Sequence, residues 1–175
     1  MSTTIVVSYF LSYPPSLLPT LSEHDACIWA LGTSSTGHSE ESYTKITYDY
    51  LVKAVEAIKE GRTQTGTEKM FQFVYLSAEG ADQSEKSLQM FAKYLLDLPS
   101  SSNIRCSILR PGYFFPAKED AHIRSSTSRF IDKIVTPVIS NLAPSVYTPV
   151  EGLGKVAVEL SKGRWDEEKD RVFKT

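Results

Sequence analysis

The hydrophobic pattern of the chain alternates between short apolar runs and longer amphipathic stretches. Three six-residue runs that are mostly apolar have the length and composition of buried strands, at residues 26–31, 71–76 and 104–109. A β-branched run at residues 4–9 predicts a further strand near the start. A short run within residues 170–175 predicts a last strand.

Apolar residues at helical spacing predict the elements between these strands. A helix is expected from Glu40, with Ser39 as its N-cap, to Gly61, where the apolar periodicity stops. Helices are also predicted over residues 84–98, 127–142 and 151–162, and a short helical turn within the proline-containing stretch 11–25.

The alternation of strands and helices predicts an α/β fold, in which a parallel sheet lies between two layers of helices. A chain of 175 residues has the length of one domain, so we expect a single domain over residues 1–175. The sheet is short compared with those of most folds of this class.

Small or turn-forming residues follow three of the predicted strands, within positions 32–33, 77–78 and 110–112. The carboxyl ends of parallel strands meet at one edge of the sheet, and ligands of open α/β sheets bind there. One such turn could have small residues only because a tight turn between a strand and a helix needs them. Three in succession favour a binding site for a small molecule.

Composition excludes several other classes of function. A net charge of −2 provides no positive field for nucleic acid. No apolar run is long enough to cross a membrane and no signal peptide is recognisable, so a cytoplasmic protein is expected. Cys27 and Cys106 lie in apolar runs and are predicted to be buried thiols, and the histidines lack metal-ligand spacing, so no metal is expected.

The stretches "DACIWALGTSSTGHSEESYTKITYDYLVKAVEA", "FVYLSAEGAD" and "LRPGYFFP" together resemble the atypical short-chain dehydrogenase/reductase family. Within it, the chain is similar to small fungal epimerase-like proteins. The resemblance implies an NAD(P)-binding Rossmann-like three-layer sandwich, here with a shortened sheet, and NADP or NAD as the cofactor.

The resemblance also implies roles for single residues. It places Ser77 at the position of the family's catalytic serine. Tyr43, on the helix after the strand at 26–31, is added as a second candidate catalytic residue, although tyrosines at its spacing from Tyr50 also occur in cores and interfaces. The positions implied to contact the cofactor are Leu31, Gly32, Thr33, Ala78, Pro111, Gly112 and Tyr113.

Two departures from the family pattern change the expected activity. The family's first strand and its glycine-rich phosphate loop have no counterpart here, which implies a domain truncated at its N-terminal side. The family's Tyr-x-x-x-Lys pair is replaced by Phe91 and Leu95, while Lys93 points to another side of the helix. We therefore expect no ordinary redox activity.

The missing strands would leave the strand at residues 26–31 with an open edge. Two pairings could cover this edge. Residues 5–7 could pair with it in parallel, as we predict, or another chain could pair with it, which would make a homodimer.

The expected function is binding of a small ligand, or non-redox chemistry at the former cofactor site. The alternatives are an NAD(P)H-dependent oxidoreductase and a protein-interaction module that uses the sheet edge or the helices.

Overall fold

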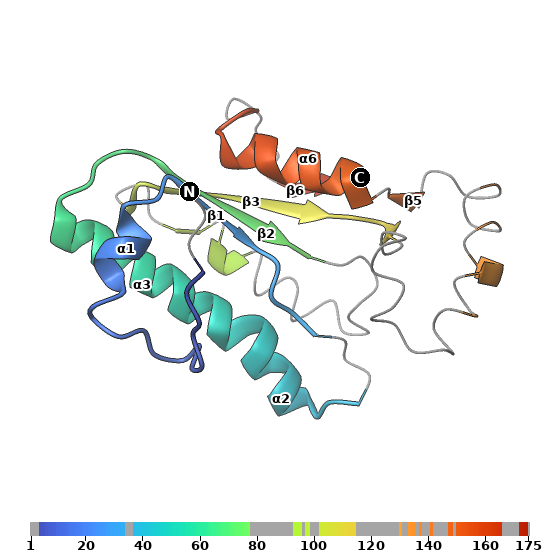
Figure 1. Ribbon diagram of the computed structural model, residues 1–175, viewed down its shortest axis with the longest axis horizontal. Coiled ribbons are helices and arrows are strands. Elements are labelled where there is room, and N and C mark those ends of the chain that lie inside the picture. The colour runs from blue at the N-terminus through green and yellow to red at the C-terminus, as the bar shows by residue number, and fades with distance from the viewer. Residues whose placement is uncertain are drawn as a thin grey trace.

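A computed structural model describes residues 4–33, 37–77, 93–95, 97–98, 102–114, 130, 133–135, 137, 141, 147–148, 150–165 and 172–174. In this part of the chain, strands and helices alternate as the sequence pattern predicts (Figure 1). None of the helices described has the length and apolar character that crossing a bilayer requires.

The main sheet has four strands in the described part of the chain, in the order β1-β2-β3-β6. They are β1 (Ala26–Trp29), β2 (Phe71–Leu76), β3 (Ile104–Arg110) and β6 (Val172–Lys174), and all their pairings are parallel. The four corresponding strand predictions are confirmed, although β1 ends two residues early. A second, small parallel sheet joins β4 (Tyr113–Phe114) to β5 (Tyr147–Thr148).

A long helical stretch follows β1. It consists of α2 (Glu40–Thr44), a π-helical turn η1 (Lys45–Asp49) and α3 (Tyr50–Thr65). The predicted start is confirmed, because the Ser39 hydroxyl accepts a hydrogen bond from the Ser42 amide at 3.2 Å.

The predicted end of this helix at Gly61 is wrong. The helix continues to Thr65 and closes on Gly66, which has the left-handed backbone (φ 64°) of a C-terminal glycine. Gly61 instead lies where α1 (Leu18–Ser22) crosses α3, and a Cβ there would run into the Leu18 carbonyl oxygen. The helix needs a glycine at this position because another backbone passes against it.

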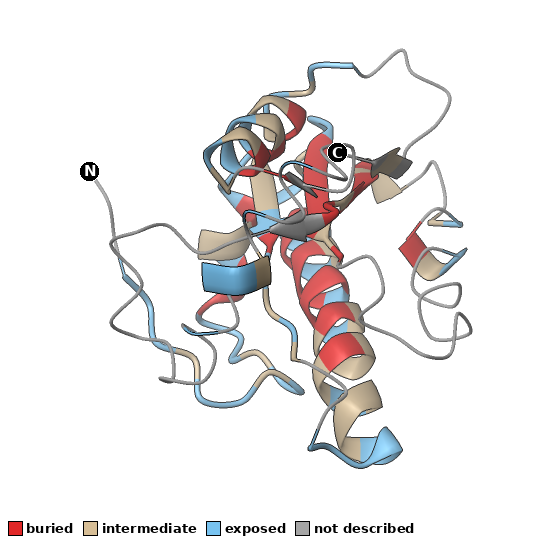
Figure 2. Cartoon of the chain, turned by 90° about the vertical axis from the view of Figure 1, so that its right-hand side faces the viewer, coloured by how far each residue is buried: buried red, intermediate tan, exposed pale blue. Residues whose placement is uncertain are grey.

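Helices cover both faces of the sheet, which confirms the three-layer arrangement. In Figure 1, α1 and α3 lie on one side of the strands and α6 (Val150–Ser161) lies on the other. The face of α3 that meets the sheet is a buried stripe (Figure 2).

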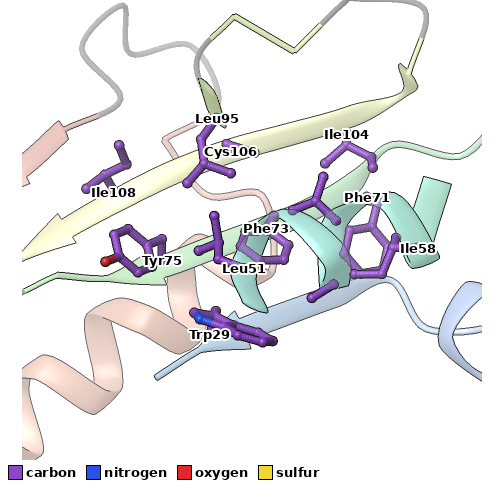
Figure 3. Close-up of a cluster of buried hydrophobic side chains, with 12 residues drawn as sticks. Trp29, Leu51, Ile58, Phe71, Phe73, Tyr75, Leu95, Ile104, Cys106 and Ile108 are labelled. Atoms are coloured by element: carbon purple, nitrogen blue, oxygen red, sulfur yellow. The ribbon is translucent and has the colours of Figure 1, made fainter. Parts of the chain in front are cut away.

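The two core clusters follow from the alternation along the strands. Figure 3 shows the larger cluster, in which α3 packs on side chains of β1, β2 and β3. Its buried members are Trp29, Leu51, Ala54, Val55, Ile58, Phe71, Phe73, Tyr75, Leu95, Ile104, Cys106 and Ile108. The smaller cluster joins the opposite face to α6 through Val74, Leu109, Leu153, Ala157 and Leu160.

The predicted strand at residues 4–9 is wrong, and so is its pairing with residues 26–31. The structure gives residues 4–9 no strand, and Val6 is 86% exposed. β-branched residues favour a strand only where a neighbouring strand and a packed face are available. Among the described residues, β1 pairs with β2 alone and forms an edge of the sheet.

The two cysteines are both free thiols. Cys106 is fully buried and Cys27 is partly exposed, and both stand opposite Phe73, from the two sides of β2. Two strand spacings place them roughly 9–10 Å apart, beyond the reach of a disulfide. Burial raises the pKa of the Cys27 thiol to about 11.

The predictions for residues 84–98 and 127–142 fall mainly outside the described residues. Within these stretches, residues 93–95, 130, 133–135, 137 and 141 are helical. The helix predicted at 151–162 is confirmed by α6, one residue earlier at each end.

Candidate functional site

The parallel strands bring their carboxyl ends to one edge of the sheet. In Figure 1 the arrowheads of β1, β2 and β3 point the same way, and the chain leaves β1 there to reach α2. The Ser77 amide donates a hydrogen bond to the Leu109 carbonyl at 2.9 Å, which ties the end of β2 to that of β3. Candidate residues far apart in sequence thus meet at this edge.

Ser77 and Tyr43 both lie by Tyr75. The Ser77 side chain is buried and shares a hydrogen bond with the Tyr75 phenol. Burial raises the pKa of Tyr75 to about 12; the nearby Tyr43 adds to the rise, and the hydrogen bond from Ser77 opposes it. The structure therefore places the two predicted catalytic residues around a third group, a phenol that keeps its proton at neutral pH.

Tyr75 is a residue that the sequence reasoning did not select. The sequence did contain evidence for it, because residues two apart on a strand lie on the same face of the sheet. Ser77 follows Tyr75 at this spacing. Tyr43 comes from the end of α2, where Thr47 in the π-helical turn donates a hydrogen bond to the Tyr43 carbonyl at 2.7 Å.

His38 connects the loop after β1 to α2. Its Nε2 lies 3.1 Å from Thr33 Oγ1 and its Nδ1 lies 3.3 Å from Ser42 Oγ. A neutral imidazole can serve both contacts, as donor at one nitrogen and acceptor at the other. The spacing of the histidines along the chain gave His38 no role. Its position between Thr33 and the N-cap Ser39 was the sequence feature that could have suggested these contacts.

Gly32 borders open space. A Cβ built on this residue meets no atom within 4 Å, and Gly32 is exposed. Its neighbours Leu31 and Thr33 are half-buried, and Leu31 packs on the larger core cluster. No contact with a described residue therefore requires a glycine at position 32.

Trp29, at the end of β1, carries a buried hydrogen-bond donor without a partner. The indole stacks on the Phe73 ring, with the ring centroids 6.4 Å apart, and its Nε1 has no hydrogen-bond partner among the residues that the structure describes. Figure 3 shows this nitrogen and the Tyr75 hydroxyl directed to the same, carboxyl side of the strands. A buried donor left unpaired costs about 1–3 kcal/mol, so an acceptor placed here would be favourable.

The end of β3 is occupied by the chain itself. Pro111 and Gly112 are buried, and the Gly112 amide donates to Thr148 Oγ1 at 3.1 Å. Tyr113 forms the β4–β5 pair with Tyr147, and its side chain lies outside the described residues, as does the whole of Ala78. Thr148, which the sequence reasoning missed, fixes this turn in place.

The positions expected to replace the family's Tyr-x-x-x-Lys pair are described in part. Leu95 is 1% exposed and belongs to the core, whereas Lys93 is exposed. Phe91 lies outside the described residues. In the described part of the chain, no three His, Cys, Asp or Glu side chains gather as metal ligands would. The His24 Nδ1, just after α1, lies 2.7 Å from the Thr20 carbonyl oxygen of that helix.

The chemistry available at this edge is hydrogen bonding, and one of its groups is charged, because Arg110 ends β3 and its buried Nε has no hydrogen-bond partner among the described residues. Hydroxyl, phenol and indole groups can orient a ligand that offers oxygen acceptors. A phenol with a pKa of about 12 donates a hydrogen bond but is a weak general acid near neutral pH.

Known proteins give a fold but no close relative. No family model matches the chain, and no curated protein matches it. Among solved structures, the chain is similar to a putative 2-deoxy-D-gluconate 3-dehydrogenase from Agrobacterium tumefaciens with bound NADP, at a TM-score of 0.59 and 15% identity. The match covers 91% of this chain and 69% of that one. At this identity the likeness confirms the predicted fold, a Rossmann-like α/β sandwich.

Proposed function

We propose that this chain is a relative of the NAD(P)-dependent short-chain dehydrogenases/reductases that binds a small ligand at the carboxyl edge of its sheet and does not transfer hydride. The shared fold and the three strand-end motifs support the relationship. The reducing conditions of the cytoplasm, the proposed location, suit its two free cysteines.

The observation that carries this proposal is the unpartnered indole N–H of Trp29 beside the Tyr75–Ser77 pair. A ligand with a carbonyl or hydroxyl oxygen would satisfy the indole N–H and gain a hydrogen bond from the hydroxyl groups. Open space at Gly32 would let such a ligand approach the backbone closely. The proposed ligand class is therefore a neutral or weakly charged hydroxylated or carbonyl compound.

The absence of hydride transfer is proposed because the proton-donor machinery is replaced. Leu95 lies in the core where the family has its lysine, and the exposed Lys93 does not substitute for it. Burial raises the pKa of the Tyr75 phenol to about 12, so this phenol would be a weak proton donor to a carbonyl that is being reduced.

The second candidate is an NAD(P)H-dependent oxidoreductase. It is favoured by the NADP bound in the similar dehydrogenase and by Ser77, which stands at the family's serine position. In that case Gly32 and Thr33 would lie against the cofactor.

Indole resonances in a nitrogen-15 spectrum separate these functions, because the chain has two tryptophans and only Trp29 lies at the site. The exposed Trp165 is the internal control. The compounds added are neutral sugars, polyols, 2-deoxy-D-gluconate, NADPH and NADH, and NADPH absorbance is followed in parallel with each carbonyl compound.

The proposal predicts that at least one sugar, polyol or sugar acid shifts the Trp29 signal and leaves Trp165 unchanged, while NADPH absorbance stays constant. Consumption of NADPH would establish the oxidoreductase instead. Failure of every compound to move the Trp29 signal would contradict binding at this edge.

A further inference from the structure

The edge of β1 and the segment at residues 4–9 are two unpaired strand-forming surfaces in one chain. In the described part of the molecule, β1 hydrogen-bonds only to β2, so its outer backbone groups face away from the sheet. Ile28 on this edge strand is 40% exposed. Exposed strand edges of this kind pair readily with another extended chain.

Residues 4–7 have the composition of a strand but no partner. The sequence Thr-Ile-Val-Val is β-branched throughout, yet Ile5 is 50% exposed and Val6 86% exposed. Together with the residues up to Leu17, this segment surrounds a hollow of about 670 Å³. Few packed contacts therefore hold residues 4–7 against their own molecule.

The next residues anchor this segment beside the open edge. The Phe10 ring lies 6.4 Å from that of Trp29, the last residue of β1, and 5.3 Å from that of Tyr50. Tyr13 lies near Cys27 of the same strand. Residues 4–7 are thus joined, through Phe10, to the same strand whose edge is open.

We propose that residues 4–7 of one copy add as a strand to the β1 edge of a second copy, giving a strand-exchanged homodimer. The four residues match the four of β1 in length. Their backbone would pair with the open edge, and their apolar side chains would cover Ile28. A two-fold exchange pairs both open edges at once, so the contact closes on itself and does not propagate into fibres.

Sedimentation velocity over a range of concentrations tests the exchange in the full chain. Val6→Lys and Val6→Pro remove strand pairing at an exposed position, and Val158→Lys makes the same charge change at an exposed valine of α6. We expect a concentration-dependent dimer for the wild type and for Val158→Lys. Both Val6 variants should weaken the dimer by about tenfold or more, with the thermal unfolding of the monomer unchanged.

Hydrogen exchange identifies the paired strand. The amides of Ala26 and Ile28, which point away from β2, should become protected as the wild type dimerises, and remain unprotected in Val6→Pro. A monomer at every concentration would overturn the proposal, and so would a dimer that Val6→Lys leaves intact. Protection of these amides in a monomer would also overturn it, because it would show that residues 4–7 pair within their own chain.

Discussion

Gly61 and Gly32 are glycines for different reasons, and they mark two differently built regions. At Gly61, the α1 backbone crosses α3 so closely that a Cβ would meet the Leu18 carbonyl, and the Ser22 Cβ would be 3.3 Å away. At Gly32, a Cβ would meet nothing within 4 Å. The first glycine is required by the close approach of two helices, whereas no contact among the described residues requires the second.

The side chains around the two glycines differ in the same way. The α1–α3 crossing is closed by buried residues such as Leu18 and Ser22. The carboxyl edge near Gly32 instead holds a buried indole N–H without a partner and a phenol held protonated. We infer that packing determines the first region, while the second is left incomplete for a ligand.

The largest expected effect is that of Gly61→Ala. The added methyl group must push α1 away from α3, at a cost of about 1–3 kcal/mol, which exceeds the gain of up to about 1 kcal/mol from replacing a helical glycine. Gly154→Ala on α6 is the matched control, because a Cβ there meets nothing, so it should stabilise the protein. Urea unfolding of both variants measures the difference; equal behaviour would mean that the crossing is not tight.

Alkaline pH should destabilise the protein through Tyr75. Its pKa is about 12 in the folded chain and 10.0 ordinarily, so between pH 10 and 12 the unfolded chain has lost the proton and the native chain has kept it. Stability is therefore level below pH 10 and falls as the pH rises through this window, by on the order of 2 kcal/mol for this residue.

The variant Tyr75→Phe isolates this contribution. It should lose less stability than the wild type between pH 10 and 12 in urea titrations, whereas Tyr9→Phe, at an exposed tyrosine, should follow the wild type. The wild-type decline also contains shares from Tyr13 and Tyr94, whose pKa values burial likewise raises to about 12. An unchanged slope in Tyr75→Phe would refute the burial of this phenol.

A smaller loss is expected for Ser77→Ala. Removing the hydroxyl leaves the buried Tyr75 phenol without this hydrogen bond, at a cost of about 1 kcal/mol. Ser12→Ala, at an exposed serine of the N-terminal segment, should change stability by less than about 0.5 kcal/mol. Equal stability of the two variants would show that Ser77 contributes no hydrogen bond to the folded state.

The sequence alone was sufficient for elements with a clear period or a strong cap. The strands at 71–76 and 104–109 and the helix start at Glu40 were predicted nearly to the residue, because buried runs and the Ser39 cap act locally. Residues 4–9 were mispredicted because a strand needs a neighbour, which composition does not reveal. Gly61 was mistaken for a helix end because its close contact comes from Leu18, far away in sequence.

The candidate site was predictable to a similar extent. Ser77, Gly32 and Thr33 could be selected because they follow apolar strands, and a parallel sheet brings strand ends together. Tyr75 and Trp29 resembled ordinary core residues. In the sequence, an aromatic residue within an apolar strand looks the same whether or not its polar atom takes part in a site. The contact between His38 and Thr33 depends on the path of a loop.

The most direct test of the account compares ligand affinity in Gly32→Val and in the wild type, using the tightest-binding compound found with the Trp29 indole signal. Because a Cβ at position 32 meets no atom of the described residues within 4 Å, the free energy of unfolding should change by less than about 0.5 kcal/mol. The ligand must share that space, so its dissociation constant should rise about tenfold or more. Equal affinities in the two proteins would contradict the claim that this edge of the sheet is the binding site.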